Sequence, residues 1–68
     1  MKISARNQLP GRITAITPGA VNGTVKVEIA PGMIVTASIT GEAIADLALA
    51  EGDQVTVLIK ASDVLIGK

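Results

Sequence analysis

Alternation of apolar and polar residues with a period of two is the feature that most restricts the fold of this chain. The alternation runs through residues 24–29, 33–40 and 54–60. Successive side chains of a strand point to opposite faces, so each segment predicts a strand with one buried face. Residues 12–17 are also rich in β-forming residues, but Ile13 and Ile16 would fall on opposite faces of a regular strand. We therefore expect one face of that strand in the core and the other at a subunit contact.

Residues that favour turns separate these segments. The dipeptide Pro10-Gly11 precedes the strand expected at 12–17, and further breaks are expected at Pro18-Gly19, Asn22-Gly23 and Pro31-Gly32. After the last long segment, Val64 and Ile66 predict a short final strand. The positions of these turn residues therefore predict five short strands.

Only residues 41–49 have a helical pattern. Thr40 is a suitable N-cap, Glu42 suits the first turn, and Ile44, Leu47 and Ala48 form one apolar stripe that we expect to end before Gly52. The predicted order is β-β-β-α-β-β, with residues 1–68 as a single domain. It matches a small all-β fold, a five-stranded β-barrel of the oligonucleotide/oligosaccharide-binding (OB) type with one short helix after the third strand.

The composition excludes several classes of function. The chain has no Cys, His, Phe, Tyr or Trp. Zinc sites, thiolate nucleophiles and Ser-His-Asp triads are therefore excluded, and we expect no enzyme and no site for a metal cation. Six basic residues balance six acidic ones, and no aromatic side chain is present to stack on a base, so a nucleic-acid partner is the weakest hypothesis. No segment predicts a membrane span or a signal peptide, so we expect a cytoplasmic protein.

The chain is too short and too apolar to be stable alone. With 68 residues, 49% of them hydrophobic, it has no disulfide to reinforce a core that would contribute only about 3–5 kcal/mol. We therefore expect an obligate oligomer, with a somewhat apolar monomer as the alternative.

Two segments at opposite ends of the chain are rich in hydrogen-bond donors. Residues 4–8 contain a hydroxyl, a guanidinium and two amides, and residues 60–62 add an ammonium and a second hydroxyl. With the main-chain N–H groups around Ala5 or Ala61, this donor set suits a small tetrahedral dianion. The residues alone leave open that Arg6 and Lys60 are ordinary solvated cations.

The same segments carry a family resemblance. The opening Met-Lys-Ile-Ser-Ala-Arg-Asn-Gln-Leu-Pro-Gly-Arg, the central Gly-Ala-Val-Asn-Gly and the closing Leu-Ile-Lys-Ala-Ser-Asp-Val-Leu-Ile-Gly resemble a molbindin, or Mop domain, over essentially the whole chain. The resemblance implies binding of molybdate or tungstate, with no organic cofactor, and assembly as a hexamer built as a trimer of dimers. It also implies oxyanion sites at the subunit interfaces.

The resemblance also implies residue roles. Ser4, Ala5, Arg6 and Asn7 of one subunit would meet Lys60, Ala61 and Ser62 of another around one anion. The two serines would donate hydroxyls, the two alanines main-chain N–H groups, and Arg6 and Lys60 positive charge. A second class of site, near a threefold axis, would lie at Gly19, Ala20 and Val21. The expected function is storage and homeostasis of these oxyanions inside the cell, and the alternative is a structural or regulatory interaction module that depends on the anion.

Overall fold

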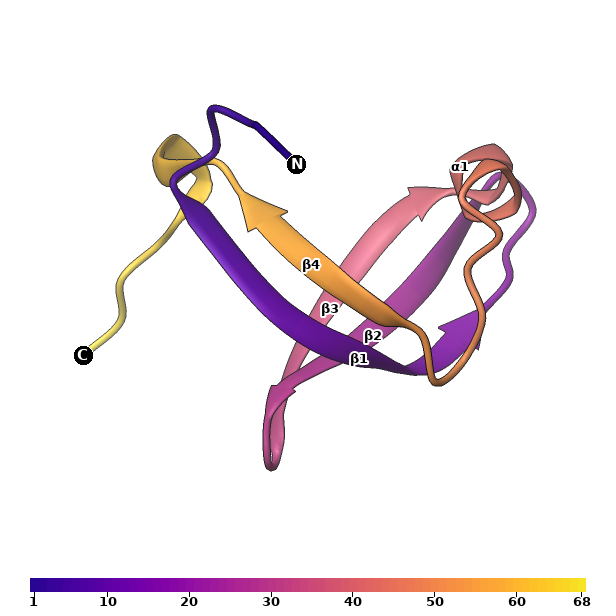
Figure 1. Cartoon of the computed structure of the whole chain (residues 1–68), viewed down its shortest axis with the longest axis horizontal. Coiled ribbons are helices and arrows are strands. Elements are labelled where there is room, and N and C mark those ends of the chain that lie inside the picture. Colours follow the sequence, from indigo (N-terminus) through magenta and orange to yellow (C-terminus); the bar gives the residue numbers. More distant parts are fainter.

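The chain folds into one curved antiparallel sheet with a short helix at one end (Figure 1). The computed structural model describes all residues 1–68. The strands are β1 (Asn7–Thr17), β2 (Asn22–Ala30), β3 (Met33–Thr40) and β4 (Gln54–Ile59), in the order β3-β2-β1-β4. Helix α1 (Gly41–Asp46) follows β3, and a 3-10 turn, η1 (Ala61–Asp63), follows β4. The predicted all-β class and the helix after the third strand are confirmed.

The sheet curls because its longest strand has a different neighbour along each half. β1 pairs with β4 from Asn7 to Arg12 and with β2 from Arg12 to Thr17. Pro10 and Gly11 therefore lie inside β1, and the expectation that they precede the strand was wrong. Pro10 is tolerated because β2 does not pair with this half of β1, which leaves one edge open. Gly11 is required by a close approach, since a Cβ there would lie 2.7 Å from the main-chain oxygen of Glu28.

A β-bulge in β1 gives its two isoleucines the same orientation. Ile13 pairs with Val27, but Ala15 pairs with the preceding residue of β2, Lys26, so Thr14 is an extra residue in the ladder. The extra residue reverses the alternation. Ile13 is buried and Ile16 packs against the same cluster, so the expectation that they serve opposite faces was wrong.

The two predicted turns that flank β2 have different outcomes. Pro31-Gly32 is a two-residue turn between β2 and β3, and Gly32 has the positive φ of +76° that such a turn requires. Asn22-Gly23, by contrast, begins β2 and pairs with the end of β3. The chain reverses earlier, between Thr17 and Asn22, so the expected hairpin turn at Asn22-Gly23 was wrong.

Helix α1 begins as predicted and ends earlier. The Ala43 N–H donates to the Thr40 hydroxyl oxygen at 3.0 Å, which confirms the N-cap. The helix ends at Asp46, because Ala48 adopts a left-handed φ of 50° and the Leu49 N–H donates to the Ile44 carbonyl at 3.1 Å. Ile44 and Leu49 pack on the core, whereas Leu47 is 67% exposed. The predicted helix at 41–49 and its three-residue stripe were therefore too long.

The core is small and the barrel is not closed. Only four of 68 residues are buried, and the apolar ones among them are Ile13, Val25 and Val27. β3 and β4 are the two sheet edges and do not pair with each other. Val64 to Ile66 form no strand, which corrects the five-stranded prediction, and the chain is a four-stranded half-barrel. The only α-helix is far too short and too polar to span a bilayer.

Candidate functional site

The pairing of β1 with β4 brings the two ends of the chain together. Asn7, the first residue of β1, pairs with Ile59, the last residue of β4. The residues that precede β1 therefore lie beside those that follow β4. Figure 1 shows the N-terminal segment and the coil after β4 at one end of the molecule, opposite helix α1.

A hollow of about 420 Å³ lies between these two segments. Its walls are Ile3, Ser4, Ala5, Arg6, Lys60, Ala61 and Ser62, which we call the donor hollow. Every residue predicted for the main oxyanion site lines it, with the exception of Asn7. The two predicted segments meet within a single chain, and a contribution from a second subunit stays a prediction. Ile3 is the lining residue that the sequence did not indicate, because a single apolar residue beside a polar run has no distinctive signal.

The donor hollow offers hydrogen-bond donors and positive charge. Its charged residues are Arg6 and Lys60, and no acidic side chain lines it. None of the turn and loop hydrogen bonds uses the main-chain N–H groups of Ser4, Ala5, Arg6, Ala61 or Ser62 as donors. These N–H groups, two serine hydroxyls, a guanidinium and an ammonium are the donors that the lining residues offer. Such a set can bind a small oxyanion.

Two side-chain amides bond to the main chain beside this hollow. Asn7 Nδ2 donates to the carbonyl oxygen of Ile59 at 3.1 Å, and Gln8 Nε2 donates to that of Ala5 at 2.9 Å. Asn7 is half-buried and lies outside the lining, so its observed role is to join the two segments. Its predicted contact with an anion stays a prediction.

The residues predicted for a second oxyanion site lie elsewhere. Gly19, Ala20 and Val21 form the exposed connection between β1 and β2, beside α1 (Figure 1). The Val21 carbonyl accepts a hydrogen bond from the Gly41 N–H at 2.8 Å. None of the three residues lines either of the two main hollows, and the second site stays a prediction.

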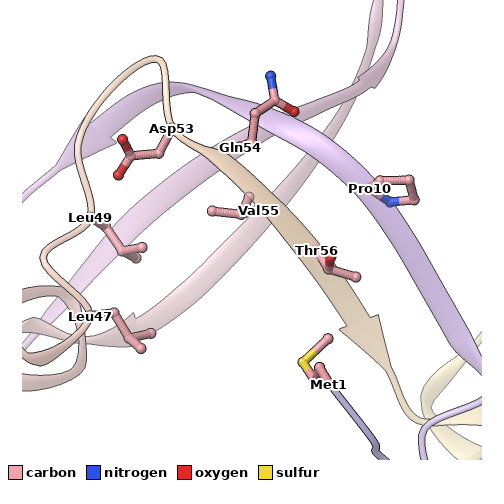
Figure 2. Close-up of a pocket in the computed structure, with 8 residues that line it drawn as sticks. All are labelled: Met1, Pro10, Leu47, Leu49, Asp53, Gln54, Val55 and Thr56. Carbon is pink, nitrogen blue, oxygen red and sulfur yellow. The ribbon is translucent and has the colours of Figure 1, made fainter.

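A larger hollow, of about 590 Å³, lies between the end of α1 and β4, and it is mainly apolar. Met1, Leu47, Leu49 and Val55 surround it, as Figure 2 shows. Its one carboxylate, Asp53, accepts a hydrogen bond from the Ala50 N–H at 2.9 Å and is thereby held in its own loop. No group of three or more acidic, histidine or cysteine residues gathers anywhere in the chain. The larger hollow also has Gln54 and Thr56 in its lining, but its carboxylate would repel a dianion.

Comparisons with known proteins agree with this geometry. The model of the TOBE domain matches residues 3–66. The chain is 47% identical over 66 residues to molybdenum-pterin-binding protein 3 of Clostridium pasteurianum, with 97% of each chain covered. A molybdate-binding protein from Sporomusa ovata superposes with a TM-score of 0.93 at 38% identity over the full length of both chains. The cytoplasmic molybdate-binding protein ModG, solved with molybdate bound, gives a TM-score of 0.90 at 40% identity, covering 96% of this chain and 46% of that one.

Proposed function

The chain belongs to the TOBE domain family, and on that premise we propose that it binds molybdate in the donor hollow without catalysing a reaction. The observation that carries the proposal is the meeting of two donor-rich segments around a space with no acidic lining residue. Molybdate is a tetrahedral dianion with acceptor oxygens only. Hydrogen bonds to a charged acceptor contribute about 1.5–3 kcal/mol each, so several of them offset the loss of its hydration.

Tungstate is the second ligand that this site should accept. Tungstate and molybdate have the same charge and shape and nearly the same size, so a set of fixed donors has little means to distinguish them. Sulfate has the same charge in a smaller tetrahedron, so it reaches fewer of the fixed donors at once. We therefore assign selectivity against sulfate to the size of the hollow.

The site is built to hold and release an anion, and storage and homeostasis of molybdate in the cytoplasm is the physiological role we assign to it. ModG, which shares the fold, is described as cytoplasmic. The alternative role is an anion-dependent interaction module in a larger assembly. It is favoured by the observation that this chain spans only 46% of ModG, so the same fold occurs within longer proteins. Co-purification distinguishes the two roles, because a storage protein leaves the cell without a stoichiometric protein partner.

We place the protein in a homo-oligomer, and the hexamer is the assembly implied by its resemblance to molbindins. The support is that the single chain leaves strand edges unpaired and large apolar side chains in water. β3 and β4 have open edges, and Leu65 and Ile66 are 92% and 89% exposed. Large apolar side chains left in water are typical of interfaces. A second copy that covers them would also lie near the donor hollow, because residues 60–62 lead directly into this tail.

A molybdenum-pterin is the other ligand that the relatives' names suggest. The chain has no aromatic side chain on which a pterin ring could stack, so we favour the bare oxyanion. The same composition gives a simple test. Without Phe, Tyr or Trp the protein itself has almost no near-ultraviolet absorbance, so a bound pterin in freshly purified material would be visible directly. Its absence, together with molybdenum in elemental analysis, is the expected result.

Isothermal titration calorimetry tests the proposed function. The wild-type protein should bind molybdate and tungstate and bind sulfate much more weakly. Arg6→Ala should weaken molybdate binding by about 1.5–3 kcal/mol for each charged hydrogen bond lost. Arg12→Ala is the matched control, because Arg12 is an exposed arginine on β1 that does not line the hollow. Equal binding of all three anions, or of none, contradicts the proposal, and equal effects of the two arginine substitutions contradict the placement of the site.

A further inference from the structure

Two neighbouring side chains at the start of β1 hold the two walls of the donor hollow. Gln8 donates from Nε2 to the carbonyl oxygen of Ala5, and Asn7 donates from Nδ2 to that of Ile59. The first bond reaches the segment before β1, and the second reaches the residue before Lys60. Gln8 is exposed and does not line the hollow, so its own contacts with the bound anion do not explain this arrangement.

The geometry of the peptide bond connects the Gln8 contact to the anion site. In a trans peptide the carbonyl and the N–H of the next residue point in opposite directions, and this chain has no cis peptide bond. A bond that fixes the Ala5 carbonyl therefore also fixes the direction of the Arg6 N–H. The bond from Asn7 to the Ile59 carbonyl joins the start of β1 to the residue before Lys60, so it holds the two walls of the hollow together.

The same two bonds also determine where the partial negative charge of two carbonyl oxygens lies beside the donor hollow. A carbonyl oxygen carries partial negative charge, and a free one turned toward a dianion would repel it. The amides of Gln8 and Asn7 hold these oxygens in hydrogen bonds of 2.9 and 3.1 Å. Donors that are fixed before the ligand arrives lose less conformational entropy on binding.

We propose that Gln8 is a positioning residue for the oxyanion site, which it prepares by holding the Ala5–Arg6 peptide, and that Asn7 keeps the two walls of the site together. This inference rests on the proposed function. It separates the polar run at residues 4–8 into residues that face the anion and residues that orient them.

The test uses Gln8→Met, which keeps the length of the side chain and removes the donor. Molybdate affinity should fall about threefold to tenfold, the effect of one neutral hydrogen bond. The unfolding midpoint of the ligand-free protein should stay unchanged, because Gln8 is exposed. The amide resonance of Arg6 in the ligand-free protein should shift, which reports the change in orientation directly. Gln54→Met is the matched control, since Gln54 is an exposed glutamine at the other end of the β1–β4 ladder.

The outcomes separate this inference from the proposed function. If the wild type binds molybdate and Gln8→Met binds it equally well, the positioning role is overturned and the proposed function stands. If Gln54→Met loses as much affinity as Gln8→Met, the effect is not specific to the Ala5 carbonyl and the inference is again overturned. If the wild-type protein binds no molybdate, both the proposed function and this inference fail.

Discussion

Ala48 has the most unusual backbone conformation of any residue other than glycine. Its φ of 50° lies in the left-handed region, which costs an L-residue about 1–2 kcal/mol. The conformation is kept because it completes a helix end in which the Ala48 and Leu49 N–H groups donate to the carbonyls of Ala45 and Ile44. It also turns Leu49 toward the core, where that side chain packs with Ile44.

Ala48→Gly should therefore stabilise the protein. Glycine adopts this φ without penalty, and after its larger loss of chain entropy we expect a net gain of about 0.5–1 kcal/mol in the free energy of unfolding. Thermal unfolding followed by circular dichroism measures the change. Ala45→Gly, inside α1, is the control and should destabilise by about 1 kcal/mol. A loss of stability in Ala48→Gly would contradict the explanation that the left-handed φ of residue 48 has an energetic cost in the wild type.

The residues of the site show what sequence can and cannot predict at this scale. Ser4, Arg6, Lys60 and Ser62 were candidates because their segments are rich in donors and contain no acid, but the residues alone left ordinary solvated cations open. The family resemblance was needed to assign them to one site. The role of Asn7 could not be predicted, because its bond to the Ile59 carbonyl depends on the register between β1 and β4. Gln8 was part of the same polar run, and only the structure shows that its amide faces the Ala5 carbonyl.

At the scale of elements, the strands followed from alternation and their irregularities did not. Period two identifies β2, β3 and β4, because each keeps one face toward the core along most of its length; the register of β2 shifts only near its end, between Glu28 and Ala30. In β1 a bulge at Thr14 reverses the alternation. The amino-acid types around Thr14 do not predict this bulge. The dipeptide Pro10-Gly11 was misleading for a related reason: Gly11 is a place of close approach between strands and was mistaken for a turn residue.

Gly11→Ala tests this reading of β1. An added Cβ would lie 2.7 Å from the Glu28 oxygen and 2.7 Å from Val27 Cγ1, and a main-chain oxygen in a paired strand cannot move freely. We expect a loss of about 1–3 kcal/mol in the free energy of unfolding, typical of overpacking. Gly67→Ala, where nothing lies within 4 Å, is the neutral control. Chemical denaturation gives both values, and equal stability of the two variants would mean that β1 and β2 do not approach so closely.

At the scale of the whole molecule, the half-barrel leaves many large apolar side chains exposed, which supports the proposed oligomer. Only Ile13, Val25 and Val27 form its buried apolar cluster, and disulfides are absent. A core of this size supplies little of the free energy that folding requires. The sequence predicted this shortage from composition, but it placed Val64 and Ile66 in a fifth strand of the same chain. In the single chain these residues form no strand and pair with neither open edge of the sheet.

Leu65→Asp should weaken the assembly that we propose. Leu65 is 92% exposed in the single chain, and its burial in an interface is worth about 1.5–3 kcal/mol. The dissociation constant of the oligomer should rise roughly tenfold to a hundredfold per contact. Sedimentation velocity over a range of concentrations measures it, with Lys68→Asp as a control for charge in the same tail. A wild-type protein that sediments as a 6.9 kDa monomer at every concentration contradicts the oligomer itself.

The position of molybdenum in a crystal shows whether the donor hollow binds the anion. Anomalous scattering from crystals grown with molybdate locates the metal without reference to any assumed site. We expect a molybdenum peak in the donor hollow, within hydrogen-bond reach of main-chain N–H groups of residues 4–6 and 61–62. Molybdenum found only elsewhere, for example beside the larger apolar hollow, or no ordered molybdenum at all, would contradict it.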